Sequence, residues 1–338
     1  MGELSERERF GRRMRLQGEP LVRSHVAITY PVWKEFGSRL DWLEGFSPHV
    51  HAGISRTPGR QAYAEETDRW GCRWIYPLES LDGQCIGHPL ASYEDLAAWR
   101  PPDPAEFTDW EQARRGVAQA HQEGRPYCGG TDHGFVFLRL TYLRGFHRLM
   151  LDVAEERPEL DRLIGIVEGY WLGVVERWVE AGVDEVSFGD DLGLQERLPI
   201  SPQAWRRHLK PSYRRIFSRC REHGVHVHLH TDGHILEIIP DLIECGVSTL
   251  NPQDLVNGLD NLQRLARGKV YLHLDIDRQK LTVFGTPREC EAHVLACIGT
   301  LGSPRGGLSC VWGVYPGTPL ANIEAVVRAL DRHAAHWC

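Results

Sequence analysis

The sequence of 338 residues lacks several patterns that would assign it to a specialised class of protein. No apolar run approaches the roughly 18 residues that a membrane-spanning helix requires. There is no long basic run and the formal net charge is −7, so nucleic acid is not an expected partner. With 42% hydrophobic and 25% charged residues, the composition is typical of a soluble globular protein.

Paired cysteine spacing and the apolar core of a signal peptide are also missing. The nine cysteines are scattered, and the N-terminal residues are polar. We therefore expect a cytoplasmic protein with reduced thiols, most of them buried as small apolar side chains. No Gly-x-Gly-x-x-Gly follows an expected strand, which disfavours a dinucleotide-binding fold.

What the sequence does contain, from about residue 124 onward, is a repeated alternation of short β-like runs and amphipathic helical segments. Strands are expected at residues 126–130, 185–189, 225–232, 248–251, 270–276 and 308–312. Such alternation predicts parallel strands joined by crossover helices. An α/β fold of the (β/α)8 TIM-barrel type fits the length best, and a doubly wound open sheet is the alternative.

The first hundred residues differ in composition, being rich in Gly, Pro, Trp and His after a charged helical segment at residues 5–17. Pro101-Pro102-Asp103-Pro104 marks a boundary, because proline ends regular structure. We predict an N-terminal helix and cap or lid region at residues 1–105 and the barrel at 106–338, together forming one domain.

The most informative strand reads Val225-His226-Val227-His228-Leu229-His230-Thr231-Asp232. Side chains alternate faces along a strand, so the three histidines share one face and Asp232 follows on that side. Active sites of TIM barrels lie at the carboxyl ends of the strands. We therefore expect His230 and Asp232 to be functional, whereas His226, deeper in the strand, fills a polar interior.

Acidic residues follow two other expected strands. Asp190 and Asp191 come directly after residues 185–189; in an extended chain they point opposite ways, so one would cap the following turn and the other would face the pocket. The strand at 270–276 places Tyr271, His273 and Asp275 on one face. The candidate catalytic residues are Asp190, Asp191 and Asp275.

Histidine and carboxylate side chains are accepted zinc ligands, and a catalytic zinc site keeps one position open. The candidate ligands are His230, Asp232, His228 and Cys310, and one of Asp190 and Asp191 is the alternative to Cys310 as a third ligand. Cys310 could instead be a buried core thiol. Tyr142 and Arg144 lie in a basic segment that could bind an anion. The candidate substrate contacts are Tyr142, Arg144, Gln195, His273 and Trp312.

Several further motifs are found along the chain. They are Thr67-Asp68-Arg69-Trp70-Gly71, Gly134-Phe135, Gly182-Val183-Asp184, His230-Thr231-Asp232-Gly233, Phe284-Gly285-Thr286-Pro287 and Gly313-Val314-Tyr315-Pro316-Gly317-Thr318-Pro319. With these motifs the chain resembles the uroporphyrinogen decarboxylase superfamily over nearly its whole length. The resemblance implies a (β/α)8 barrel.

Residues of these motifs also differ between two branches of that superfamily. Pro31-Val32-Trp33 is not followed by the arginine pair of the porphyrinogen decarboxylases, and Trp312 stands at their late histidine. The cobalamin-dependent methyltransferases and demethylases bind zinc through His-x-Cys-Gly and a later cysteine. His230 matches that histidine, Asp232 replaces the first cysteine, and Trp312 aligns with the later one. Cys310, two residues earlier, would lie on the same strand face. We regard the chain as closer to this second branch.

The resemblance therefore implies a methyltransferase or demethylase of a small substrate, assisted by zinc and dependent on a corrinoid. The corrinoid must be carried by a separate partner protein, because the chain shows no cobalamin-binding module. One alternative is a cofactor-free decarboxylase of a smaller carboxylate, in which Asp191 stabilises a protonated intermediate and Arg144 holds a carboxylate. Another is a non-enzymatic ligand-binding barrel. A homodimer is compatible with each of these functions.

Overall fold

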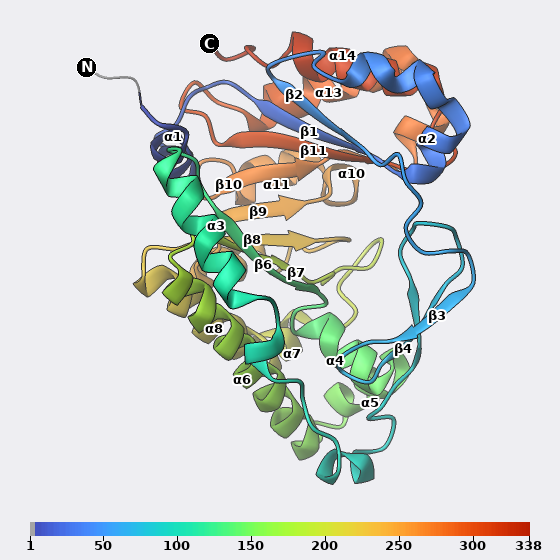
Figure 1. Ribbon diagram of the computed structural model, residues 1–338, viewed down its shortest axis with the longest axis vertical. Coiled ribbons are helices and arrows are strands. Elements are labelled where there is room, and N and C mark those ends of the chain that lie inside the picture. Colours follow the sequence, from blue (N-terminus) through green and yellow to red (C-terminus); the bar gives the residue numbers. More distant parts are fainter. Residues whose placement is uncertain (1–3) are drawn as a thin grey trace. The chain divides into compact units, whose positions relative to one another are not determined.

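The computed structural model describes residues 4–338 and has the alternating strands and helices of an α/β protein (Figure 1). The strands of its large sheet are β1 (Arg23–Ile28), β2 (Val50–Ile54), β6 (Cys128–His133), β7 (Glu185–Gly189), β8 (His226–Thr231), β9 (Thr249–Pro252), β10 (Tyr271–Asp275) and β11 (Leu308–Val314). Eight strands of parallel direction, joined by helices, confirm the predicted (β/α)8 TIM-type fold class.

Two compact units divide the chain, and each is described by itself. Among the described residues, the first comprises 4–15, 66–74 and 85–250, and the second comprises 16–65, 75–84 and 251–338. In the first unit, β7 pairs with β6 and β8. In the second, β1 pairs with β2 and β11, and β11 pairs with β10. The predicted division near residue 105 stays a prediction, and β1 and β2 precede it.

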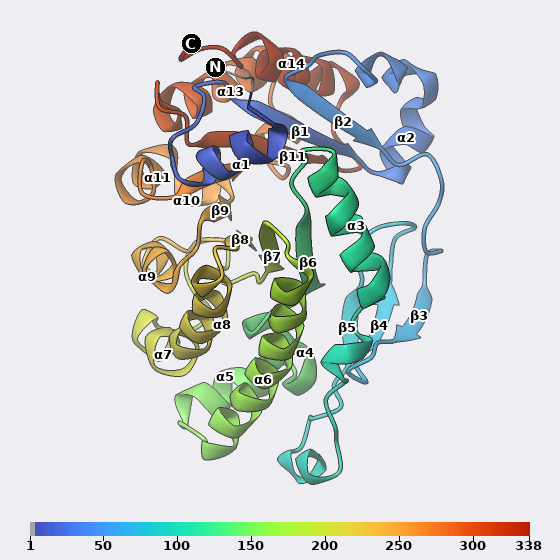
Figure 2. The same cartoon turned by 60° about the vertical axis from the view of Figure 1, so that its left-hand side comes forward.

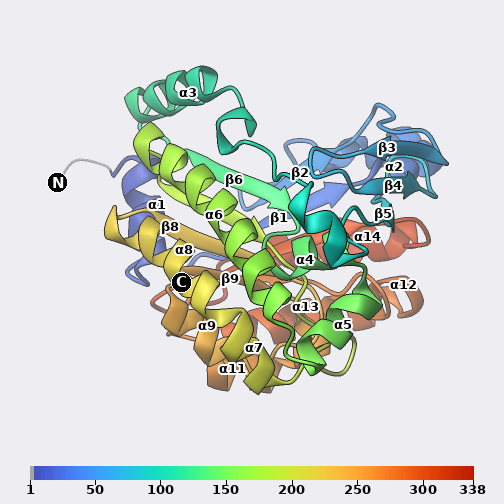
Figure 3. The same ribbon diagram turned by 90° about the horizontal axis from the view of Figure 1, so that it is seen from below.

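The first unit contains the helices that surround the histidine strand. They are α1 (Glu6–Met14), α3 (Trp110–Gln122), α4 (Phe137–Arg144), α5 (Phe146–Ala154), α6 (Pro158–Ala181), α7 (Pro202–His208), α8 (Lys210–Glu222) and α9 (Ile239–Cys245), with the 3₁₀ turns η2 (Tyr93–Ala97) and η3 (Pro104–Glu106). α6 and α8 lie side by side (Figures 2 and 3). As predicted, α7 begins after Ser201, whose hydroxyl accepts a hydrogen bond from the Ala204 amide at 3.1 Å.

The second unit contains α2 (Tyr30–Phe36), η1 (Gly37–Leu43), α10 (Asp254–Asn257), α11 (Leu259–Leu265), α12 (Leu281–Phe284), α13 (Pro287–Leu301) and α14 (Leu320–Arg332). Thr286 and Glu289 form the predicted capping box at the start of α13.

The short strands β3 (Ala64–Thr67), β4 (Arg73–Tyr76) and β5 (Gln84–Gly87) form a small sheet in that order.

The apolar face of β8 is packed as the alternation predicts. Val227 and Leu229 have no exposed surface, whereas His228 and His230 are half-buried. On neighbouring elements of the first unit, Phe135, Phe188 and Phe217 pack with ring centroids 4.7–5.7 Å apart. The apolar face of β8 is therefore buried next to an aromatic core, and the opposite face, which carries the histidines, is available for polar contacts.

The cysteines and the lengths of the helices bear on two further sequence predictions. All nine cysteines are free, and most are buried. Within residues 4–338, none of the helices combines the length and the apolar character needed to span a bilayer.

Candidate functional site

The carboxyl ends of β6, β7 and β8 bring two histidines together in the first unit. In the strand register, Gly189 of β7 lies opposite His133 of β6 and His230 of β8. A side chain at Gly189 would crowd this arrangement, because a Cβ there would lie 3.0 Å from Cδ2 of His133. Asp191 follows two residues later and reaches both imidazoles.

We call His133, Asp191 and His230 the strand-end cluster. Nε2 of His133 lies 3.6 Å from Oδ2 of Asp191, and Nε2 of His230 lies 3.8 Å from Oδ1. One ligand atom from each residue falls within 4.8 Å of the other two. Two imidazoles and a carboxylate at this spacing fit the donor set of a catalytic zinc ion. Asp232 stands beside them, with Oδ1 3.4 Å from Nε2 of His230.

Backbone contacts fix the loops that carry these acids. The Asp232 amide donates to Oδ1 of Asp191 at 3.1 Å, and the Gly193 amide donates to the Asp232 carbonyl at 3.1 Å. Gly233 has a φ of +83°, and a Cβ there would lie 2.2 Å from the Gly193 carbonyl oxygen. Both loops therefore need glycine where they touch, which accounts for the glycine that follows His230-Thr231-Asp232.

Asp190 has a different role from its neighbour. It is fully buried and accepts hydrogen bonds from the amides of Val136, Phe137 and Leu138 at 2.7–2.8 Å, and from the hydroxyl of Tyr213. These amides form the start of α4, where a carboxylate is stabilised by the helix dipole. Burial raises the pKa of Asp190, while the four donors oppose that shift.

The electrostatics of the strand-end cluster favour a charged pair when no metal is bound. Burial acts to raise the pKa of Asp191, but hydrogen bonding and the charges of His133 and His230 outweigh it and lower that pKa. The hydrogen bond to Asp191 in turn raises the pKa of His133, whose side chain is about half exposed. Asp191 is therefore ionised at neutral pH and available as a ligand or as a partner for a cation.

Tyr142 forms an aromatic wall near the cluster. A Cβ on Gly134, directly after His133, would lie 2.6 Å from the Tyr142 ring, and that ring packs against Trp74 at 4.7 Å. Burial, followed by the charge of Asp191, raises the pKa of the Tyr142 hydroxyl. Tyr142 is thus a neutral, half-buried side chain at the edge of the site.

The Thr67–Gly71 motif supports this wall through Asp68. Its carboxylate accepts hydrogen bonds from the Trp70 and Cys72 amides at 2.9 Å and from Nε1 of Trp74 at 3.0 Å. Arg139 of α4 lies 3.2 Å from the same carboxylate. The motif therefore fixes a tight loop onto α4 and positions Trp74 against Tyr142.

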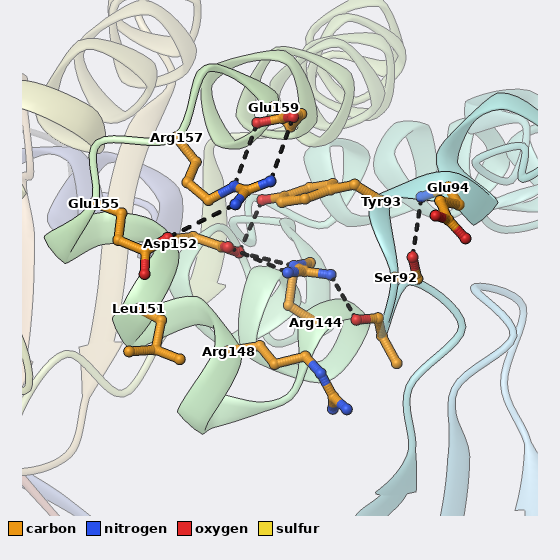
Figure 4. A pocket seen from close by; sticks show the side chains of 11 residues that line it. Ser92, Tyr93, Glu94, Arg144, Arg148, Leu151, Asp152, Glu155, Arg157 and Glu159 are labelled. Carbon is orange, nitrogen blue, oxygen red and sulfur yellow. Dashed lines mark hydrogen bonds and ion pairs between the residues drawn. The ribbon is translucent and has the colours of Figure 1, made fainter.

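The guanidinium of Arg144 is bound by other residues of the protein. It pairs with both oxygens of Asp152 at 2.8 and 3.2 Å, donates to the carbonyls of Leu90 and Ala91, and stacks on Tyr93. Figure 4 shows the contacts of Arg144 with Asp152 and Tyr93 in the wall of a cavity of about 560 Å³. Because its donors are already used, Arg144 is not part of the function proposed below.

Other predicted site residues of the first unit lie outside the strand-end cluster. His228 precedes His230 by two residues on β8, and its Nδ1 lies 2.8 Å from the Ser187 hydroxyl. Gln195 is on an exposed stretch of the loop after β7. Their roles as a ligand and as a substrate contact stay predictions.

The remaining predicted residues belong to the second unit. Asp275 ends β10 and forms an ion pair with Arg278, and His273 lies two residues earlier on the same strand. Trp312 is fully buried, with Nε1 donating to the Asp277 carbonyl at 3.2 Å. Cys310 is also fully buried. The proposed catalytic, substrate and ligand roles of these side chains stay predictions.

His133 is the residue that the sequence reasoning missed. Thr131-Asp132-His133-Gly134 resembles the end of the histidine strand, where a threonine and an acid also precede a glycine. Extending the expected strand at 126–130 by three residues would have placed His133 at a strand end, where site residues are expected.

Comparisons with known proteins agree with this fold. A family model described as uroporphyrinogen decarboxylase (URO-D) matches residues 76–333. A methyltransferase from Methanosarcina mazei is similar in structure, with a TM-score of 0.63 and 17% identity, over 98% of this chain and 99% of that one. No curated protein matches the sequence.

Two other solved structures are similar at lower scores. D-psicose 3-epimerase from Clostridium cellulolyticum H10 has a TM-score of 0.36 and 16% identity, covering 69% of this chain and 83% of that one. A B12-independent methionine synthase from Shewanella sp. W3-18-1 has a TM-score of 0.39 and 10% identity, covering 83% and 76%. The family match spans most of the sequence, and the chain belongs to the uroporphyrinogen decarboxylase family.

Proposed function

We propose that this protein is a methyltransferase or demethylase that binds zinc at His133, Asp191 and His230 and exchanges a methyl group with a corrinoid carried by a separate protein. The observation that carries the proposal is the convergence of these ligands at three adjacent strand ends. Membership of a family of enzymes and the fold shared with a methyltransferase support it.

The ligand set indicates the kind of substrate. A bound zinc ion would act as a Lewis acid on the atom that carries the methyl group. The strand-end cluster contains nitrogen and oxygen donors and no sulfur, so it would form a harder centre than a thiolate site. Such a centre suits a methyl group attached to oxygen or nitrogen.

Asp232 and the aromatic wall would complete the site. Asp232 is 30% exposed, lies beside His230, and would hold the proton taken up by the heteroatom when its methyl group leaves. Tyr142 and Trp74 would exclude water from one side of the substrate.

The test is methyl transfer to free cobalamin reduced to the Co(I) state, with O-methyl and N-methyl compounds as donors and methylcobalamin absorbance as the readout. Zinc-dependent turnover is expected with the wild type. His230→Ala should lower the rate at least about 100-fold, because it removes a ligand. His228→Gln changes a histidine on the same face outside the cluster and should retain most of the rate. Equal losses in the two variants would contradict the assignment.

A cofactor-free decarboxylase is the second candidate. The ion pair between Asp191 and His133 favours it, because an imidazolium could bind a carboxylate and Asp191 could stabilise a cationic intermediate. This candidate predicts release of CO₂ from a small carboxylate in the presence of a chelator. Chelator-sensitive methyl transfer supports the first candidate instead.

A further inference from the structure

A second group of potential ligands lies inside the second unit. Nε2 of His293 is 2.6 Å from Oδ2 of Asp254, and Sγ of Cys297 is 3.4 Å from Nε2 of His293 and 3.9 Å from Oδ2 of Asp254. Asp254 is 1% exposed and Cys297 is fully buried. We call these three residues the second-unit cluster. It contains none of the strand-end ligands.

Local structure directs these side chains at one point. His293 and Cys297 are four residues apart on α13, so they project from the same face of the helix. Asp254 begins α10, directly after β9, and its carboxylate accepts the Leu255 amide at 2.5 Å and the Asp277 amide at 3.1 Å. These amides fix the orientation of the carboxylate, as outer hydrogen bonds do for metal ligands.

We propose that Asp254, His293 and Cys297 form a buried structural site for zinc or a similar divalent ion. Their one nitrogen, one oxygen and one sulfur donor are all accepted ligands of zinc. The Cys297 thiol would lose a proton to solvent as the ion binds. The ion would join α10 and α13, the elements that carry the three ligands.

Cobalt(II) titration of the reduced, metal-free chain tests this proposal, because thiolate ligands give a near-ultraviolet charge-transfer band. The strand-end cluster has no sulfur and cannot produce that band. The wild type should show it, and Cys297→Ser should abolish the band, because Cys297 is the thiol of the cluster, and should lower the cobalt affinity by about 100-fold or more. Cys290→Ser is the matched control, since Cys290 is also buried on α13 but lies outside the cluster.

A second measurement uses only the wild-type chain, so it does not require that a substituted variant folds. In the wild type, zinc added to the metal-free chain should raise the unfolding temperature through preferential binding to the folded state. A wild-type chain that binds cobalt without the charge-transfer band has no thiolate site, and the cluster is then a hydrogen-bonded packing contact. A band that is equal in Cys297→Ser would also overturn the proposal.

Discussion

Asp190 and Asp191 are adjacent in the chain, yet their carboxylates serve different structures. Asp190 accepts three amides at the start of α4 and the Tyr213 hydroxyl, while Asp191 faces His133 and His230. This follows from strand geometry, since neighbouring residues in an extended chain point to opposite sides. One acid thus stabilises the scaffold, and the other is available for chemistry.

The first prediction is that substitutions at these two positions have different effects. Asp190→Ala leaves buried amides of α4 and the Tyr213 hydroxyl without their acceptor, and should lower the free energy of unfolding by about 2–5 kcal/mol. Asp191→Asn should change it by less than about 1 kcal/mol while abolishing metal binding at the strand-end cluster. Urea unfolding and metal analysis measure the two effects. Similar losses of stability would contradict the separation of roles.

The second prediction concerns the pH dependence of stability and rests on Glu185. Burial raises the pKa of this carboxyl from 4.5 to about 7. Since the folded state holds the proton more tightly, the stabilising contribution is fully present below pH 4.5 and is lost as pH rises through 7. Glu185→Gln keeps a neutral side chain, so its stability relative to wild type should increase from pH 5 to pH 8 by at most about 3 kcal/mol.

Thermal or urea unfolding at both pH values measures this difference. Glu180→Gln is the control, because Glu180 is an exposed carboxylate on α6. The difference in the free energy of unfolding between Glu180→Gln and the wild type should be the same at pH 5 and pH 8. If Glu185→Gln also showed no dependence on pH, burial would not raise the pKa of Glu185 in the folded protein.

The third prediction is selective reactivity of one cysteine in the first unit. A hydrogen bond from Cys72 and the nearby His88 lower the pKa of Cys85 to about 7, against the effect of burial. Cys85 is half-buried, whereas Cys72 is fully buried. Iodoacetamide should therefore label Cys85 with a half-maximal rate near pH 7. Peptide mass spectrometry across pH identifies the site, and faster labelling of Cys72 would contradict the assignment.

Much of the fold was predictable because local patterns were strong. The bounds of β7 were predicted to the residue, since a short β-like run with Val186 and Phe188 follows a Gly-Val-Asp turn and ends before two acids. β1 and β2 were not predicted. Arg23–Ile28 contains a histidine and a serine, and Val50–Ile54 contains a histidine and a glycine, so neither reads as an apolar strand.

The site was predictable only in part for a related reason. His230 lies near the end of a recognisable strand, and Asp232 and Asp191 follow such strands, so these residues could be predicted from their positions at strand ends. β6 begins Cys128-Gly129-Gly130 and shifts register between Gly130 and His133, so its apolar signal is weak and its end is concealed. The choice between Asp190 and Asp191 depends on where α4 begins in space, which local sequence does not specify.

The most direct test of the proposed zinc site is the zinc content at the strand-end cluster, measured in a Cys297→Ser background so that the second-unit site does not contribute. After zinc loading and dialysis, this variant should retain about one zinc ion per chain. Adding His133→Ala or His230→Ala should remove it while the far-ultraviolet circular dichroism stays unchanged. A zinc content that is unchanged by both histidine substitutions, or absent from the Cys297→Ser protein, would show that these side chains do not form a metal site.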